Sequence, residues 1–293
     1  MNSRHTIWLV LLGVTANASA DEPATQSYLQ SVRALGSAKF STREAASKHL
    51  SSGGATALCI VLDHADLTDL EVFTRVIQLI QITSARHDSA TMHAAMDKLK
   101  HMATSDDPQD RSHAMQVLST IHRRALETVL AAGGKLQTIK WPDGKTGVKV
   151  TLYQWRKSTL VALMSLSQLH LVLSGPRFED TGLTELHRLK NMRVLDLRYT
   201  RAGDHTLHSV SQLTALEKLY LSRTPITDRG VSHLKTLQGL TELFLSDTSI
   251  TDDCLSQLDK LPQLQRVSLR GTQITETAIE AFRARHPRCL IQY

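Results

Sequence analysis

The second half of the chain switches between two hydrophobic periods. Apolar residues occupy every second position around 219 and 221, and they recur every third position from 231 to 240. A period of two is typical of a strand with one buried face, and a period between three and four is typical of a helix. The pattern therefore predicts a unit of strand, loop and short helix.

This unit repeats every 24 residues along the chain. One unit cannot bury its apolar face alone, whereas stacked units form a continuous core. We therefore predict an α/β solenoid of the leucine-rich repeat class over residues 153–293. Its strand positions are Leu171/Leu173, Leu195/Leu197, Leu219/Leu221, Leu243/Leu245 and Val267/Leu269.

Two polar columns accompany the leucines. Acidic residues stand where each helix is expected to begin, and threonines stand where the chain leaves each strand. A carboxylate at a helix start can accept hydrogen bonds from free backbone N–H groups, and a threonine hydroxyl can bind the backbone of a turn. We interpret both columns as structural, and the carboxylates as helix caps rather than a metal or acid–base site. The columns are Asp180, Asp204, Asp228, Asp252 and Glu276, and Thr200, Thr224, Thr248 and Thr272.

The stretch 219–231, LYLSRTPITDRGV, resembles the 24-residue leucine-rich repeats of secreted bacterial proteins, notably the planctomycete type. In those repeats a strand is followed by Gly/Ser-x-Thr-x-Val/Ile-Thr-Asp and a short helix. The same general pattern occurs in ribonuclease-inhibitor-like and F-box-associated repeats. The resemblance implies a ribonuclease-inhibitor-like horseshoe and is nearly silent on the ligand.

The ends of the array depart from the repeat. Val150 precedes Leu171 by only 21 residues. The run Leu169-x-Leu171-x-Leu173 leaves the strand register of the first repeat ambiguous by two residues. At the other end Arg285 and Arg288 replace the expected apolar residues, and a last strand near 290–293 is expected to close the core. Terminal repeats are expected to be atypical because one side meets water.

A hairpin is predicted in front of the first repeat. Residues 136–140 and 148–152 alternate in polarity around Trp141-Pro142-Asp143-Gly144, and Asp-Gly between such runs is a hairpin signal. We assign residues 135–152 to a capping hairpin and first strand that covers the first repeat. Trp141 is then expected in the capping core rather than in a binding site.

Residues 21–134 are predicted to be helical. Ser41-Thr42-Arg43-Glu44 matches a capping box, and the pair Gly133-Gly134 marks the expected boundary with the hairpin. The stretch Phe40 to Ala46, followed by Leu50, resembles HEAT-like helical pairs; a small helical bundle without true repeats is the alternative. The longest helix follows Pro108, and its expected buried face holds Met115, Leu118, Ile121, Leu126 and Leu130.

Residues 1–20 are interpreted as a secretory signal peptide. Arg4 and His5 precede an apolar run from Ile7 to Val14, and Ala18-Ser19-Ala20 is an A-x-A cleavage signal. The apolar run is too short to span a membrane. The protein is therefore expected to be exported, periplasmic or secreted, with no membrane span after cleavage.

Composition narrows the set of partners. The formal net charge is +6, which favours acidic partners, but nucleic acid is not an expected partner of an exported protein. An aromatic content of 4% argues against an aromatic-lined sugar or base groove. Of the three cysteines, Cys59 lies in an apolar helical run and Cys254 is expected to be a buried thiol; pairing of Cys254 with Cys289 is permitted but not assumed.

No catalytic or metal motif stands out. The chain lacks C-x-x-C, H-E-x-x-H, G-x-S-x-G and a phosphate-binding glycine loop. The densest group of possible metal ligands lies between Asp63 and Asp69, where aspartate and threonine are also expected as turn and cap residues. We therefore expect no cofactor, no metal and no enzymatic activity.

The concave face of the predicted sheet is the candidate binding surface. Residues that alternate with the buried leucines face outward, so Tyr220 and Phe244 are expected side by side on adjacent strands within a basic rim. The alternative interpretation is that they are strand formers that pair across the ladder. The candidate partner-binding residues are Tyr220, Phe244, Arg198, Lys218, Arg266, Arg270, Asp196 and Glu242.

The function predicted from these features is non-catalytic binding of a protein or peptide in the cell envelope or exterior. Binding of an anionic envelope polymer through the basic residues is the alternative, followed by an enzyme whose site carries no recognised motif. An F-box-like adaptor role is least expected, because a signal peptide is present and no F-box-like segment is found.

Overall fold

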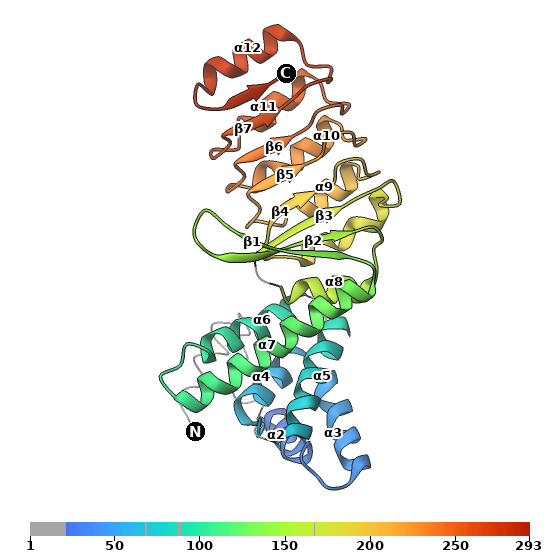
Figure 1. Ribbon diagram of the computed structural model, residues 1–293, viewed down its shortest axis with the longest axis vertical. Coiled ribbons are helices and arrows are strands. Elements are labelled where there is room, and N and C mark those ends of the chain that lie inside the picture. The colour runs from blue at the N-terminus through green and yellow to red at the C-terminus, as the bar shows by residue number, and fades with distance from the viewer. Residues whose placement is uncertain (1–21, 68, 87–88, 167) are drawn as a thin grey trace. The chain divides into compact units, whose positions relative to one another are not determined.

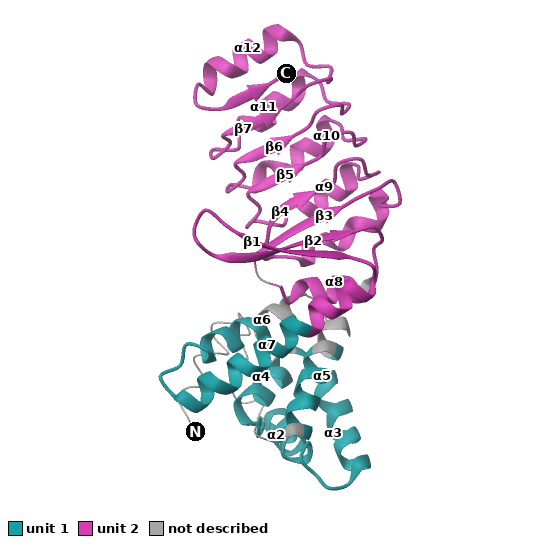
Figure 2. Ribbon diagram, viewed as in Figure 1, with its two compact units in different colours: residues 1–123 teal, residues 124–293 magenta. Residues whose placement is uncertain are grey.

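The computed structural model describes residues 22–67, 69–86, 89–166 and 168–293 (Figure 1). The predicted signal peptide, residues 1–20, lies outside these residues. The chain forms two compact units, residues 1–123 and 124–293 (Figure 2). The division falls inside helix α7 (Pro108–Ala131), upstream of the Gly133-Gly134 pair. In the described part of the chain, no helix combines the length and apolar character that crossing a membrane requires.

The first unit is helical. Helix α4 packs against α2 and α6, and α3 packs against α5, so alternate helices share a layer. Two layers of antiparallel helices are one way to bury amphipathic faces without a sheet. The HEAT-like resemblance of this unit stays a prediction. Its helices are α2 (Glu22–Ala34), α3 (Phe40–Ser52), α4 (Gly54–His64), α5 (Leu70–Arg86), α6 (Ser89–Met102) and α7.

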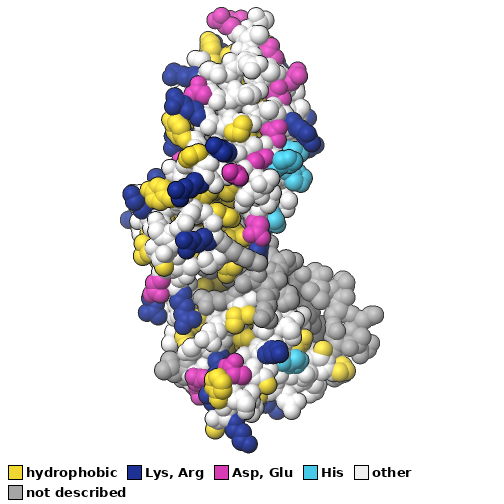
Figure 3. Space-filling view, turned by 90° about the vertical axis from the view of Figure 1, so that its right-hand side faces the viewer, with side chains coloured by type: hydrophobic (Ala, Val, Ile, Leu, Met, Phe, Trp, Pro, Cys, Tyr) yellow, Lys and Arg dark blue, Asp and Glu magenta, His cyan; other side chains and the backbone are white. Residues whose placement is uncertain are grey.

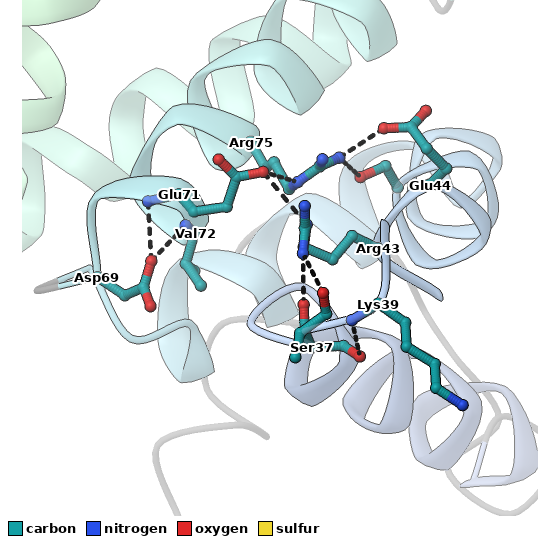
Figure 4. A network of polar contacts seen from close by, with 10 residues as sticks. Ser37, Lys39, Arg43, Glu44, Asp69, Glu71, Val72 and Arg75 are labelled. Carbon is teal, nitrogen blue, oxygen red and sulfur yellow. Dashed lines mark hydrogen bonds and ion pairs between the residues drawn. The ribbon is translucent and has the colours of Figure 1, made fainter. Parts of the chain in front are cut away.

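The predicted capping box is wrong. Helix α3 begins at Phe40, so Ser41 lies inside the helix, and the N-cap residue Lys39 makes no side-chain cap. Glu44 instead accepts a hydrogen bond from the buried Arg75 of α5 at 2.7 Å. Glu71 accepts another hydrogen bond from Arg75 at 2.8 Å (Figure 4). The glutamate of the S/T-x-x-E pattern therefore forms an ion pair with another helix, and the local sequence does not reveal that partner.

The buried face of α7 also differs from the prediction. Met115 and Leu130 are exposed, at 59% and 55% of their surface, and of the predicted five only Ile121 is fully buried. The observed stripe repeats every three or four residues, as a helix face must. Two of its members are alanines, whose small side chains give a weak hydrophobic signal in the sequence. The stripe consists of Ala114, Val117, Ile121, Ala125 and Val129.

The second unit is built on one sheet of eight strands in sequential order. Strands β1 and β2 form an antiparallel hairpin, and β2 to β8 are parallel. The hairpin places β1 at one edge of the sheet, and β8 forms the other edge. The strands are β1 (Lys135–Lys140), β2 (Thr146–Leu152), β3 (Leu169–Leu173), β4 (Met192–Asp196), β5 (Lys218–Tyr220), β6 (Glu242–Phe244), β7 (Arg266–Ser268) and β8 (Leu290–Gln292).

The strand register confirms the 24-residue repeat. Leu195, Leu219 and Leu243 pair in succession and are completely buried. The doubt at the first repeat is resolved, because Leu171 pairs with Leu195, and a bulge after Leu169 absorbs the irregular spacing. Stacked strands that bury one leucine frame make this unit a repeat solenoid.

Short helices follow the strands of the solenoid. The threonine column ties the intervening turns as predicted, since the hydroxyl of Thr200 donates to Leu197 O at 2.7 Å and Thr224, Thr248 and Thr272 repeat the bond. The helices are α8 (Lys157–Met164), α9 (Asp204–Val210), α10 (Asp228–Val231), α11 (Leu255–Leu258) and α12 (Glu276–Arg285), with 3₁₀ turns at Asp180–Arg188, Ser232–Thr236 and Asp252–Cys254.

Four members of the acidic column bind the next repeat instead of capping their own helices. Asp180 accepts hydrogen bonds from the backbone N–H groups of Gly203 at 2.8 Å and Thr206 at 2.7 Å, both in the next repeat. Asp204, Asp228 and Asp252 each accept from the backbone N–H and hydroxyl of a threonine in the next repeat, namely Thr227, Thr251 and Thr275. We call these four aspartates the carboxylate ladder. The prediction identified the chemistry but assigned it to the wrong helix.

Candidate functional site

The outward side chains of β4 to β7 form rows across the sheet, on the side predicted to be concave. Parallel pairing places Lys218, Glu242 and Arg266 side by side in one row. The next row holds Asp196, Tyr220, Phe244 and Ser268. We call the surface made by these rows, together with Arg198 and Arg270, the sheet face. It contains the eight residues predicted as the candidate binding site.

The centre of the sheet face is an aromatic stack. The rings of Tyr220 and Phe244 lie 4.8 Å apart between centroids, at an interplanar angle of 19°. Both side chains are half-buried, so one part of each ring stays open to solvent. Burial, followed by the charge of Glu242, raises the pKa of the Tyr220 hydroxyl above its ordinary value. The two residues are therefore neighbours, as the alternating pattern predicts, and form one neutral aromatic surface.

A chain of ion pairs runs beside the stack. The Glu242 carboxylate forms ion pairs with Lys218 at 2.8 Å and Arg266 at 3.5 Å, and the three side chains come from adjacent strands. Ion pairs at a protein surface contribute little stability, but they fix side-chain positions and cancel charge locally. The predicted basic rim is thus partly neutralised by its own acidic member.

Asp196 lies below the surface rather than on it. Its exposed fraction is 6%, and its carboxylate holds Arg198 through hydrogen bonds of 3.0 and 2.6 Å. The guanidinium carbon of Arg198 lies 5.2 Å from the centroid of the Tyr220 ring. A cation over an aromatic face is an attractive arrangement. Asp196 therefore positions Arg198 against the aromatic stack and is not itself a contact residue.

His170 is a member of the same face that the site prediction did not single out. It lies on β3 opposite Val194 and is half-buried. Burial, reinforced by the charge of Lys149, lowers the pKa of its imidazole to about 4. The ring is therefore neutral at physiological pH and offers a hydrogen-bonding group without adding charge. Its only sequence signal was its outward place in the strand.

A column of left-handed residues borders the sheet face where the strands end. Tyr199, Arg223, Asp247 and Gly271 have φ angles of 62°, 60°, 55° and 66°, and they are spaced by one repeat. Only glycine adopts this region without strain. Arg223 lies 5.1 Å from the Tyr199 ring centroid and pairs with Asp247 at 3.1 Å. Gly271 is the one member of the column whose residue type indicates a left-handed conformation from the sequence.

Replacing Tyr199 with glycine is expected to raise the free energy of unfolding by about 0.5–1 kcal/mol, because the backbone strain is released at an exposed position. The change is measured by urea denaturation of wild type and variant. Gly271→Ala is the matched control and is expected to destabilise, since a Cβ there would lie 2.3 Å from an Asp247 carboxylate oxygen. A Tyr199→Gly variant less stable than wild type would contradict the strain interpretation.

The other candidate chemistries do not converge on a site. Asp69 caps α5 by accepting from the N–H groups of Glu71 and Val72, and Asp63 pairs with Lys98. Thr68 of the same segment lies outside the described residues. Among the residues that are described, no group of three or more His, Cys, Asp or Glu side chains is arranged to hold a metal ion.

All three cysteines are free thiols. Burial raises the pKa of Cys254 to about 12, so this thiol is protonated and unreactive at neutral pH. The permitted disulfide between Cys254 and Cys289 is not formed.

No protein-family model and no curated protein matches this sequence. The structure is similar to the leucine-rich repeat ectodomain of the receptor kinase SOBIR1 from Arabidopsis thaliana, with 18% identity and a TM-score of 0.32 over 53% of this chain and 96% of that chain. It is also similar to a leucine-rich repeat protein of Leptospira interrogans, with 18% identity and a TM-score of 0.27 over 49% of this chain and 52% of that chain. An internalin of Listeria monocytogenes shows 17% identity and a TM-score of 0.31 over 48% of this chain and 51% of that chain. This chain thus spans about half the length of the two bacterial proteins, and the first two structures are described as leucine-rich repeat proteins.

Proposed function

We propose that this protein is a non-catalytic binding protein of the cell envelope or exterior, and that its sheet face binds a protein or peptide. The observation that carries the proposal is the half-open Tyr220–Phe244 stack at the centre of the face. Aromatic rings surrounded by polar groups are typical of the residues that contribute most to protein interfaces. Export is inferred from the A-x-A pattern ahead of residue 21.

The ladder of parallel strands supports a preformed surface. Each strand holds its outward residue at a register set by the buried leucine beside it, as Leu219 does for Tyr220. A surface that is already ordered loses little conformational entropy when a partner binds. The stack therefore presents a fixed target to which the partner adapts.

The charge arrangement favours a protein over an anionic polymer as the partner. Lys218 and Arg266 share Glu242, and Arg198 is held by Asp196, so three of the four predicted basic residues already have an acidic neighbour. A polymer bound through phosphate or carboxylate groups would have to compete with these ion pairs. An uncharged aromatic contact involves no such competition.

The double variant Tyr220→Ala/Phe244→Ala is expected to weaken binding of the protein partner by about 30-fold or more, because truncation of central aromatic residues commonly costs 2 kcal/mol or more. The measurement is recovery of bound protein from a cell-envelope extract, followed by titration of the recovered partner. The variant Phe40→Ala/Tyr293→Ala removes two exposed rings elsewhere and is the control, since Phe40 is 65% and Tyr293 48% exposed.

Salt distinguishes the two kinds of partner. Binding through the stack is expected to survive high ionic strength, whereas binding of a polymer through surface charges is screened. Recovery of only a salt-labile polymer, equally by wild type and the double variant, would overturn the proposed protein-binding function and favour the anionic envelope polymer.

A further inference from the structure

A pocket lies on the helical side of the solenoid, away from the strand residues of the sheet face. An open pocket of about 530 Å³ is formed by loops and helices of three successive repeats. Figure 3 shows histidine side chains gathered in one patch on the repeat-containing unit. The pocket lining includes Asp180, Asp204, Arg229, His205, His208 and His233.

The acidic groups of the pocket are already engaged. Asp180 accepts from the backbone of Gly203, His205 and Thr206. Both carboxylate oxygens of Asp204 accept from Thr227. These bonds belong to the carboxylate ladder and hold the repeats together. The side chains left to meet a ligand are arginines and histidines, which donate hydrogen bonds when charged.

The histidines are close enough to act on one ligand. The ring centroids of His208 and His233 lie 5.1 Å apart in an edge-to-face arrangement. Burial, followed by the charges of His208 and Arg229, lowers the pKa of His233, while Asp204 opposes this effect. An anion that accepts hydrogen bonds from both rings would stabilise their protonated forms.

The charge of the pocket depends on pH. At neutral pH the charges of its two arginines and two aspartates cancel formally. Two further charges lie at the edge of the pocket. Glu179 is 3.8 Å from Arg201, and the charge of Lys235 contributes to lowering the pKa of His233. Each imidazole that takes up a proton adds positive charge to the pocket without moving any backbone, and histidine is the side chain whose charge ordinarily changes between about pH 5 and 8.

We propose that this pocket binds an anionic group, a phosphate or a carboxylate, between Arg229, His208 and His233, and binds it more tightly under mildly acidic conditions. A volume of about 530 Å³ falls within the range of small-molecule sites, so there is room for an organic ligand that carries the anion. The site is independent of the sheet face, because none of its lining residues belongs to a strand.

The test is calorimetric titration of the full exported chain with inorganic phosphate and, separately, with glutarate. Binding of the matching anion is expected to be about tenfold tighter near pH 5.5 than near pH 7.5, because uptake of one proton on binding changes affinity by up to tenfold per pH unit. Phosphate without glutarate would identify a phosphate ligand, and the reverse would identify a carboxylate. Equal weak binding of both at the two pH values would overturn the proposal.

Variants locate the site. His208→Gln/His233→Gln is expected to remove the pH dependence, and Arg229→Gln is expected to weaken binding about tenfold or more, as loss of a charge-assisted hydrogen bond does. Arg270→Gln removes the same unit of charge from an exposed position on the sheet face and is expected to change little. If Arg270→Gln weakens anion binding as much as Arg229→Gln, the effect is general electrostatics and the pocket assignment is wrong.

Two further measurements distinguish anion binding from the proposed protein-binding function and from metal binding. The Tyr220→Ala/Phe244→Ala variant is expected to bind the anion normally, so failure of the proposed protein-binding function leaves this result intact. Zinc ion is titrated in place of the anion, because histidines are also common metal ligands. Tight zinc binding that is lost in His208→Gln/His233→Gln, with no anion binding, would overturn the anion proposal.

Discussion

Replacing Trp141 with alanine is expected to lower the free energy of unfolding of the solenoid by about 3 kcal/mol, the usual cost of truncating a buried aromatic residue. Trp141 lies in the hairpin turn and is only 8% exposed. The guanidinium carbon of Arg193 sits 4.4 Å from its ring centroid. Alanine would leave a cavity at the end of the solenoid and remove the cation–π contact.

The surroundings of Arg193 explain why this position matters. Arg193 binds Glu217 of the following repeat at 2.6 Å and Asp143 of the hairpin at 3.0 Å. It therefore joins the hairpin to two repeats, and Trp141 covers the junction. Loss of the ring exposes this network to water, where its ion pairs contribute less.

Urea denaturation followed by circular dichroism measures the effect of Trp141→Ala. Trp141→Phe is the matched control and is expected to retain most of the stability, because the indole N–H is buried without a hydrogen-bond partner in the described structure. Surface substitutions usually change the free energy of unfolding by no more than about 0.5 kcal/mol. If Trp141→Ala changes it by no more than that, Trp141 is not part of the capping core.

The second large effect is expected at the start of the carboxylate ladder. Replacing Asp180 with alanine removes the acceptor of three backbone N–H groups, donated by Gly203, His205 and Thr206. The free energy of unfolding is expected to fall by about 2 kcal/mol at neutral pH, since lost caps and unpaired amides are both destabilising. Asp252→Ala removes an equivalent but exposed ladder position and is expected to cost less.

The effect of Asp180 is expected to depend on pH. Although burial by itself raises the pKa of this carboxyl, the hydrogen bonds from Thr206, Gly203 and His205 hold the pKa below its ordinary value. A depressed pKa in the folded state contributes stability that is present above the unfolded pKa, about 3.9, and is lost as the pH falls through the folded pKa. The difference between wild type and Asp180→Ala is therefore expected to be constant near neutrality and to shrink in acid.

The matching measurement is the free energy of unfolding of both proteins between neutral pH and about pH 3. Asp180→Asn keeps one oxygen acceptor and is expected to fall between wild type and the alanine variant. A difference that grows as the pH falls would contradict the assignment of Asp180 as an ionised cap.

The sequence by itself determined the repeat, the threonine turns, the hairpin and the neighbouring positions of Tyr220 and Phe244. These features are visible because each depends on spacing along one strand or from one repeat to the next. Leu195, Leu219 and Leu243 must stack if each repeat is to bury its apolar face. Once they stack, the residues that follow them, such as Tyr220, must lie beside their equivalents on the next strand.

The tertiary structure alone decided which partner each polar side chain takes. Glu44 has the spacing of a capping box, yet it binds Arg75 on another helix. Asp180 has the position of a cap for its own helix, yet it binds the next repeat. Asp196 alternates outward, yet it is buried under Arg198. A carboxylate can accept a hydrogen bond from any donor within reach. The sequence spacing therefore indicates that the residue acts as an acceptor, but packing determines which donor it binds.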